Sequence, residues 1–270
     1  MRGRLDWDRY WHFELFRRSC DPLDFRRWKR DSQRALKSLY PGRPRLLDAT
    51  AGLGDHTVNL AEVGFDVHAC DTSAVARDAT RQALREADLD VPVIDVPWAE
   101  LGQRPERYDV VFNDALHWIY DPAELKSALA GMYAALEPGG ALVYFFADAE
   151  HPEEDAGAQI LDWDWEQMAE PRIAWQHRSE RREVSLSIVA DRGSDFIDEH
   201  HLYHHRDAAV EGGRRAPLQL ETLTMRRVYR WDHAHLTPLL EEVGFESVRS
   251  DHFDNVKGHT FAMNRAFRPR

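Results

Sequence analysis

Cysteine and long apolar runs are scarce in this 270-residue sequence. Its two cysteines, Cys20 and Cys70, belong to no CxxC or CxxH pair, which excludes a disulfide framework and gives no sign of a zinc or redox site. No apolar run approaches the roughly 20 residues that a membrane-spanning helix needs. The first residues lack the apolar segment and the cleavage site of a signal peptide. We therefore expect a soluble, cytoplasmic protein with no membrane partner.

Basic charge is also in short supply. The chain has 35 Lys and Arg residues against 47 Asp and Glu, which gives a formal net charge of -12. Proteins that bind nucleic acid through its phosphates need a basic face, and this chain has no block rich in Lys or Arg. We expect no nucleic-acid partner and a small-molecule substrate. Its 43% hydrophobic content and mean hydropathy of -0.60 indicate a globular protein with a substantial core.

The texture of the sequence changes along the chain. Two amphipathic helices are predicted over residues 6–40, followed by short apolar runs that alternate with helical stretches, the pattern of a parallel α/β sheet. Beyond about Glu150, alternating segments such as RREVSLSIVA predict antiparallel strands, and a helix over residues 232–243 precedes two closing strands. We divide the chain into an N-terminal helical cap (1–44), a nucleotide-binding core (45–150), an antiparallel insertion that caps the substrate (151–230) and a C-terminal completion of the core sheet (231–270).

The segment LLDATAGLGDHTVNLAEVGFDVHACD carries the strongest functional signal. It predicts a strand, a glycine turn at Gly52 and Gly54, a helix that begins near His56, and a second strand that ends at Asp71. Glycines permit a close backbone approach to a ligand, and a helix start offers free N–H groups. An acid at the tip of the second strand can accept both hydroxyls of a ribose. The segment therefore predicts a nucleoside cofactor.

The details separate two cofactor classes. In the dinucleotide motif G-x-G-x-x-G the third glycine position is here Thr57, which would crowd a pyrophosphate. The pattern D-x-x-x-G-x-G from Asp48 to Gly54 instead resembles motif I of the class I S-adenosylmethionine-dependent methyltransferases. The resemblance implies that the glycine turn lies against the methionine moiety and that Asp71 binds the ribose hydroxyls.

Further segments match this family in order and spacing. YDVVFNDALHWIYD resembles its fourth-strand motif, which implies that Asn113, Leu116, His117 and Trp118 line the methyl-transfer site. LEPGGALVY resembles the turn into strand five, and LLEEVGFESV the late helix and strand. The resemblance implies a Rossmann-like, seven-stranded, mostly parallel sheet with helices on both faces, an N-terminal helical cap and an antiparallel insertion after strand five. The implied cofactor is S-adenosyl-L-methionine, with S-adenosyl-L-homocysteine as product.

A narrower likeness comes from DVPWAEL, which is similar to a segment of glycine and sarcosine N-methyltransferases in which a Trp contacts the adenine. That Trp is Trp98 here, although a plain core position explains it equally well. The same enzymes have an aromatic N-terminal helix over the cofactor and a tyrosine near the end of the insertion, which Trp11 and Tyr229 match. The expected cofactor-binding residues are Asp48, Ala49, Gly52, Gly54, Asp71, Thr72, Trp98, Asn113 and Trp11, and the expected catalytic residues are His117 and Tyr229.

The predicted function is methyl transfer to a small molecule, with N-methylation of an amine or amino acid favoured. Alternatives are an O-methyltransferase, another enzyme that uses S-adenosylmethionine, or a catalytically inactive nucleoside-binding regulatory protein. An NAD-dependent dehydrogenase is disfavoured by Thr57 and by the absence of a persuasive Tyr-x-x-x-Lys. The sequence leaves open whether the protein is a homo-oligomer.

The stretch EHHLYHH places four histidines in six residues. On a strand, His200 and His204 share one face while His201 and His205 share the other, so only pairs converge. Since no Cys or carboxylate spacing completes a tetrahedral set, we expect no metal site there.

Overall fold

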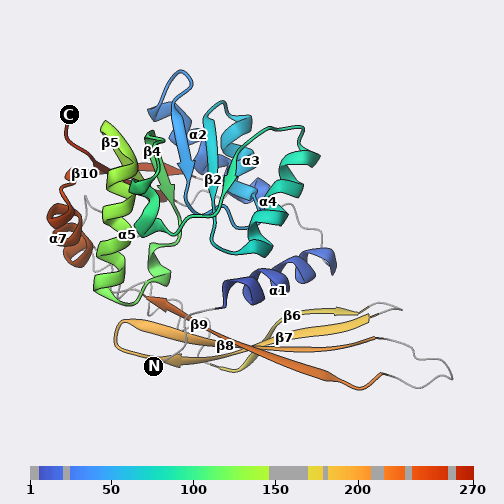
Figure 1. The fold of residues 1–270 in the computed structure, drawn as a ribbon. Helices are drawn as coiled ribbons and strands as arrows, with labels where there is room; N and C mark the ends of the chain where they lie inside the picture. Colours follow the sequence, from blue (N-terminus) through green and yellow to red (C-terminus); the bar gives the residue numbers. More distant parts are fainter. Residues whose placement is uncertain are drawn as a thin grey trace. The chain divides into compact units, whose positions relative to one another are not determined.

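A computed structural model describes residues 6–20, 25–145, 170–178, 182–207, 216–228, 233–254 and 260–270. The chain divides into two compact units. The smaller comprises Met1–Pro22 and Gly157–Arg230, and the larger comprises Leu23–Ala156 and Trp231–Arg270. Figure 1 shows the helices and strands of both.

The larger unit is built on a seven-stranded sheet of order β10-β11-β5-β4-β1-β2-β3. Strands β1 to β5 run parallel, and β11 is antiparallel to both β5 and β10. The central strands have buried apolar residues on both faces, Leu46 and Leu47 in β1 and Val110, Val111 and Phe112 in β4, as expected for a sheet covered on both sides. The strands are β1 (Arg45–Asp48), β2 (Asp66–Cys70), β3 (Val93–Ile94), β4 (Tyr108–Asn113), β5 (Leu136–Tyr144), β10 (Glu246–Asp254) and β11 (Thr260–Phe267).

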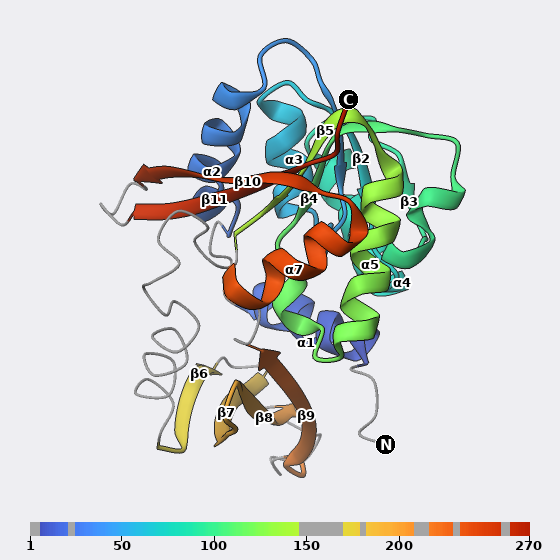
Figure 2. The same ribbon diagram turned by 90° about the vertical axis from the view of Figure 1, so that its left-hand side faces the viewer.

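Helices cover both faces of this sheet, and Figure 2 shows α2 and α3 on one side and α5 on the other. Helix starts follow local chemistry: the Ser73 side chain accepts from the N–H of Ala76, and Asp121 accepts from the N–H of Ala123 just before Pro122. The elements are α2 (Phe25–Leu39), α3 (Asp55–Glu62), α4 (Ala74–Glu86), η1 (Trp98–Gln103), η2 (Leu116–Trp118), α5 (Pro122–Ala135) and α7 (His233–Val243).

The core of the larger unit joins α2 and α3 to the middle of the sheet. Leu36 of α2 and Leu60 of α3 pack against strand residues, and both leucines are fully buried. The strand side of this cluster consists of Leu46, Val67, Val110, Phe112, Val143 and Met263. Helix α2 therefore contributes to the same core as the sheet.

The smaller unit contains α1 (Trp7–Cys20) and a four-stranded antiparallel sheet of order β6-β7-β8-β9. Phe13 of α1 stacks on Tyr203 of β8 with ring centroids 4.0 Å apart. Beside this pair, the buried Glu199 carboxylate accepts from Arg227 and from His201 Nε2. The strands are β6 (Arg172–Arg178), β7 (Arg182–Arg192), β8 (Phe196–Asp207) and β9 (Gln219–Val228).

These elements confirm the predicted fold class, including the antiparallel sheet that follows the fifth strand. One boundary was wrong. The turn expected at residues 138–140, ahead of the fifth strand, lies inside β5, where pairing with β4 is irregular between Tyr108 and Val110. In the described residues, no helix has the length and apolarity needed to cross a membrane.

The four clustered histidines of β8 alternate between the two faces of its sheet, as the period of a strand requires. His200 contacts Thr224 and Asp191, His201 contacts Glu199, and His205 contacts Glu221. The imidazoles of His200, His201 and His205 thus have separate polar partners.

Candidate functional site

The candidate site lies at the carboxyl ends of β1, β2 and β4. After β1 the chain proceeds outward through β2 and β3, whereas β4 lies on the other side of β1. Such a reversal of strand order opens a crevice beyond the carboxyl ends, which is where open α/β sheets bind ligands. The loop between β1 and α3, residues 49–54, lies at this point.

Asp48, the last residue of β1, fixes the start of this loop through hydrogen bonds. Its carboxylate is completely buried and accepts from the backbone N–H of Thr50 at 3.1 Å and from Thr57 Oγ1 at 2.7 Å. Burial raises the pKa of Asp48 and outweighs the opposing effects of His56 and these hydrogen bonds. Thr57, the residue that breaks the dinucleotide motif, is therefore the partner of Asp48, and Asp48 fixes the shape of the loop.

Both glycines of the loop have left-handed backbone conformations, with φ of 53° at Gly52 and 87° at Gly54. Residues with a Cβ rarely adopt these values. Gly54 also caps α3 and lies so close to α4 that an added Cβ would come within 3.1 Å of Thr80 Cα. The Thr80 hydroxyl in turn donates to the Gly52 carbonyl at 2.9 Å. The hydrogen bond from Thr80 to the loop backbone thus holds the loop against α4.

Asp71, at the tip of β2, fastens the other side of the loop. One carboxylate oxygen accepts from the N–H of Gly52 at 3.0 Å, and the other accepts from the N–H of Ser73 at 2.9 Å. Burial raises the pKa of Asp71, while these two backbone donors oppose the rise. Each oxygen keeps a further lone pair, so the partly exposed carboxylate can also accept from the two hydroxyls of a ribose. Thr72, the next residue, is exposed.

Trp98 and Asn113 complete the rim of the loop. The Trp98 indole N–H donates to the carbonyl of Ala49 at 2.6 Å, which fixes the half-buried ring beside the β1 strand end. Asn113 is buried at the end of β4, and its Oδ1 accepts from the N–H of Ala115 at 2.8 Å. An indole near an acid whose oxygens can accept from ribose hydroxyls suits an adenine ring, so the residues present fit an adenosyl ligand.

The predicted catalytic residues and Trp11 fall in different places. His117 is half-buried in η2, with its ring centroid 5.0 Å from that of Trp118. Trp11 belongs to α1 of the smaller unit, where it packs on Trp7 and Tyr10. Tyr229 lies outside the described residues. The larger unit thus gathers every other predicted site residue at one edge of its sheet.

A chain of polar residues at this edge was missed by the sequence reasoning. Gln33 of α2 contacts His56 Nδ1, and His56 Nε2 lies 2.7 Å from Asp114 Oδ2. Gln33 and His56 are buried, whereas 38% of the Asp114 side chain is exposed. The one available signal was Gln33, a polar residue one helical turn before buried Leu36 on the same face of α2.

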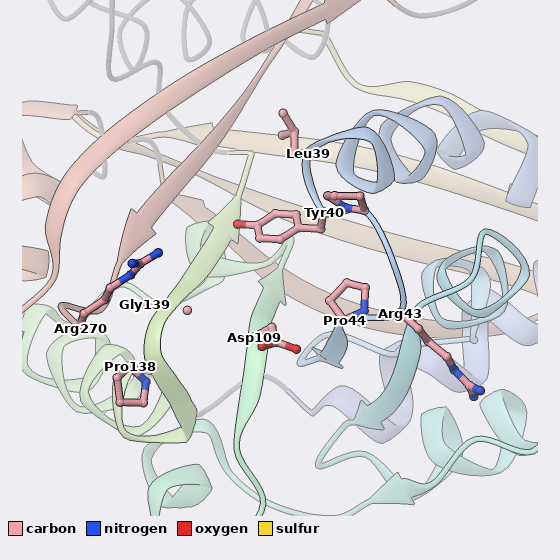
Figure 3. Close-up of a pocket in the computed structure, with 10 residues that line it drawn as sticks. Leu39, Tyr40, Arg43, Pro44, Asp109, Pro138, Gly139 and Arg270 are labelled. Atoms are coloured by element: carbon pink, nitrogen blue, oxygen red, sulfur yellow. The ribbon is translucent and has the colours of Figure 1, made fainter.

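A hollow of about 480 Å³ occurs at the opposite edge of the sheet (Figure 3). It is bordered by Tyr40, Pro44, Asp109, Gly139 and Arg270, which lie near the amino ends of β1 and β4 and in β5. Because ligands of open α/β sheets bind beyond the carboxyl ends, this hollow is separate from the candidate site.

Comparison with known proteins agrees with the geometry. Residues 46–140 match the model of a methyltransferase domain. The chain is 31% identical over 123 residues to the tRNA 5-carboxymethoxyuridine methyltransferase of Escherichia coli strain K12, which covers 44% of this chain and 46% of the relative. It is 33% identical over 106 residues to the glycine/sarcosine N-methyltransferase of Halorhodospira halochloris, covering 38% and 39%. These matches span less than half the length of either relative.

A solved structure extends the likeness in fold to most of the chain. The sugar N-methyltransferase KedS8 from Streptoalloteichus sp ATCC 53650 superposes with a TM-score of 0.63 at 20% identity, covering 96% of this chain and 93% of that one. At this identity the likeness concerns the fold alone. The match of residues 46–140 to a methyltransferase domain confirms the family resemblance for that part of the chain, and the expected S-adenosylmethionine cofactor agrees with it.

Proposed function

We propose that this chain, whose residues 46–140 form a class I S-adenosylmethionine-dependent methyltransferase domain, transfers a methyl group to the nitrogen of a small molecule. The observation that carries the proposal is the loop of residues 49–54, tied to Asp71 on one side and to Trp98 on the other. This arrangement offers carboxylate oxygens to a ribose and an indole to an adenine at one strand end. When bound, S-adenosylmethionine supplies an electrophilic methyl group on a sulfonium.

In such a transfer the protein acts mainly by positioning the two reactants. The acceptor lone pair must lie in line with the methyl carbon and the sulfur, and fixed placement of both reactants contributes most to the rate. Asp71 and Trp98 hold the nucleoside, and the loop backbone at Gly52 and Gly54 is the proposed seat of the methionine end. Asn113 fixes the turn after β4 that leads to His117.

An amine acceptor also has to lose a proton. A protonated amine has no lone pair for attack, so a base must take that proton before the transfer. His117, three residues beyond Asp114 at the same edge of the sheet, is the proposed acceptor of the proton, with Tyr229 as the second candidate. We keep Trp11 and Thr72 as proposed cofactor contacts on the family resemblance.

Small size and an amine group are the proposed features of the acceptor. The net charge of -12 disfavours approach to polyanions, and the glycine/sarcosine relative acts on small amines by its name. The match to a tRNA methyltransferase favours a second candidate, modification of a tRNA base. An acidic chain that binds tRNA needs a local basic face, so methyl incorporation into tRNA would stand against the charge argument.

Methyl transfer is measured with S-adenosylmethionine labelled in its methyl group. The acceptors are glycine, sarcosine, a panel of larger amines, their hydroxyl counterparts and bulk tRNA. The proposal predicts label in an amine. Label in a hydroxyl compound alone would make the protein an O-methyltransferase, and label in tRNA alone would establish the second candidate. Tight cofactor binding without turnover on any acceptor would indicate a nucleoside-binding regulatory protein.

The variants His117→Ala and Tyr229→Phe test the proton step. We expect His117→Ala to lower turnover most near neutral pH, where the acceptor is protonated and a neutral imidazole can still take its proton, and to leave the affinity for S-adenosylhomocysteine unchanged. Full turnover by both variants across the pH range would refute the assigned role.

A further inference from the structure

Asp114 has no role in the proposed mechanism, although its carboxylate lies at the candidate site, at the carboxyl end of β4. It directly follows β4, and its backbone N–H lies 3.4 Å from the hydroxyl of Thr50, in the loop after β1. Oδ2 is bound by His56, and no described residue forms a hydrogen bond to Oδ1. Asp114 thus contacts the loop of residues 49–54 through its backbone and precedes the η2 turn that carries His117, and 38% of its side chain is exposed.

The residues behind Asp114 hold it in its charged form. A carboxylate only accepts, so His56 Nε2 donates to Oδ2 across 2.7 Å. Gln33 contacts the other ring nitrogen, and its amide can donate to a neutral imidazole or, turned over, accept from an imidazolium. Gln33 therefore supports either protonation state of His56 and keeps the ring directed at Asp114.

Burial alone would raise the pKa of Asp114, but the hydrogen bond and charge of His56 outweigh it and lower the pKa to about 2. Lys29 of α2 and His117 of η2 act in the same direction at longer range. No described ion pair joins Lys29 to Asp114. The carboxylate is therefore a fixed anion at any pH near neutrality and a poor base.

The order of these residues differs from that of a nucleophilic triad, in which the acid is buried and the imidazole faces the substrate. Here the amide and imidazole are buried, and the acid faces outward. An outward carboxylate that keeps its charge attracts a cation. It gives little help to a hydroxyl acceptor, which would need a base to remove its proton.

We propose that Asp114, positioned by His56 and Gln33, binds the nitrogen of the methyl acceptor and selects amines over alcohols. The inference rests on the proposed methyltransferase function and specifies its substrate class. In the transfer, the lone pair of the neutral amine forms the N–C bond while the C–S bond breaks and its electron pair stays on sulfur. The positive charge thereby moves from sulfur to nitrogen, next to the Asp114 carboxylate, which stabilises it there.

The ligand sinefungin tests the proposed role of Asp114 even though the acceptor is not known. This analogue of S-adenosylmethionine carries a primary ammonium group where the transferring methyl would be, whereas S-adenosylhomocysteine has no group there. Calorimetry compares the two ligands on the full chain. We expect the native protein to prefer sinefungin about tenfold, the value of one charge-assisted hydrogen bond.

Three variants separate charge from structure. Asp114→Asn keeps an acceptor for His56 but removes the charge, so it should abolish the preference and leave the affinity for S-adenosylhomocysteine within about twofold. His56→Ala should weaken the preference, and His56→Gln, which retains an N–H donor, should restore part of it. Asp78→Asn, at an exposed acid of α4 that pairs with Arg81, is the matched control and should change neither affinity.

The outcomes are distinct. Equal affinity of the native protein for both ligands, or an undiminished preference in Asp114→Asn, overturns the role of Asp114 and leaves the proposed function intact. Failure of the native protein to bind either ligand overturns the proposed function, and the inference with it.

Discussion

Replacement of Gly131 by Ala sets helix propensity against packing, and the structure decides the sign. Gly131 lies in the interior of α5, where Ala is favoured over Gly by about 1 kcal/mol. A Cβ at this position would lie 1.9 Å from the carbonyl oxygen of Trp98 and 2.8 Å from the Cα of Ala99. Both obstacles are backbone atoms of η1, so no side-chain rotation relieves the contact.

The size of the stability loss depends on how far the backbone of η1 must move. The backbone of η1 has to retreat from α5 by more than 1 Å before the contact reaches the shortest distance that real Cβ atoms show. Overpacking of this kind costs about 3 kcal/mol. The displacement also strains the hydrogen bond from Trp98 to the Ala49 carbonyl, worth about 1 kcal/mol. After the gain in propensity, we expect Gly131→Ala to lower the free energy of unfolding by about 3 kcal/mol.

Urea denaturation followed by far-UV circular dichroism measures this change. Ala130→Gly, the reverse exchange at the neighbouring exposed position of α5, is the control and should cost about 1 kcal/mol. An increase in stability of Gly131→Ala would show that η1 does not approach α5 as described, and would remove the support for the position of Trp98.

Three further predictions concern other parts of the chain. Gly42→Ala, at a φ of 81° with open space around it, should lower the free energy of unfolding by about 1 kcal/mol. Gly54→Ala should lower it by about 1–2 kcal/mol more, because its Cβ would meet α4. Equal losses of stability in urea denaturation would refute the contact between Gly54 and α4. The folded pKa of Asp114 lies below its ordinary value, so Asp114 should stabilise the fold above about pH 4 and lose this contribution as the pH falls toward 2. Because the side chain is partly exposed, the contribution is about 1 kcal/mol. Between about pH 4 and pH 2 the free energy of unfolding of Asp114→Asn should therefore fall less than that of the native protein. Glu199→Gln should destabilise the smaller unit by about 3 kcal/mol, since Arg227 is left beside a neutral group; unchanged hydrogen exchange of the β8 amides would contradict this.

The architecture of the larger unit could be predicted from local patterns. The segments RLLD and YDVVFN, each with apolar residues at its centre, form central strands, and Asp71 was located by its place at the tip of the second strand. Each of these signals lies within one strand and the turn that follows it. Local periodicity and turn chemistry are sufficient for such elements.

The remaining features depend on contacts between distant positions. Thr57 was interpreted as an obstacle to a pyrophosphate, and the pattern gave no sign that its hydroxyl donates to the buried Asp48. Gln33, His56 and Asp114 come from a helix, the next helix and a strand end, and no sequence pattern relates them. The packing of α2 on α3, and of His56 against Phe112 of β4, brings the three together, and for that reason the sequence alone did not identify Asp114.

The central claim is that Asp71 and the loop of residues 49–54 bind the adenosyl group. Calorimetric titration of the purified protein with S-adenosylmethionine and S-adenosylhomocysteine tests it most directly, with Asp71→Ala beside the native chain. We predict micromolar binding, about −8 kcal/mol, that the substitution abolishes. Absence of binding to the native protein, or equal binding by Asp71→Ala, would contradict the claim.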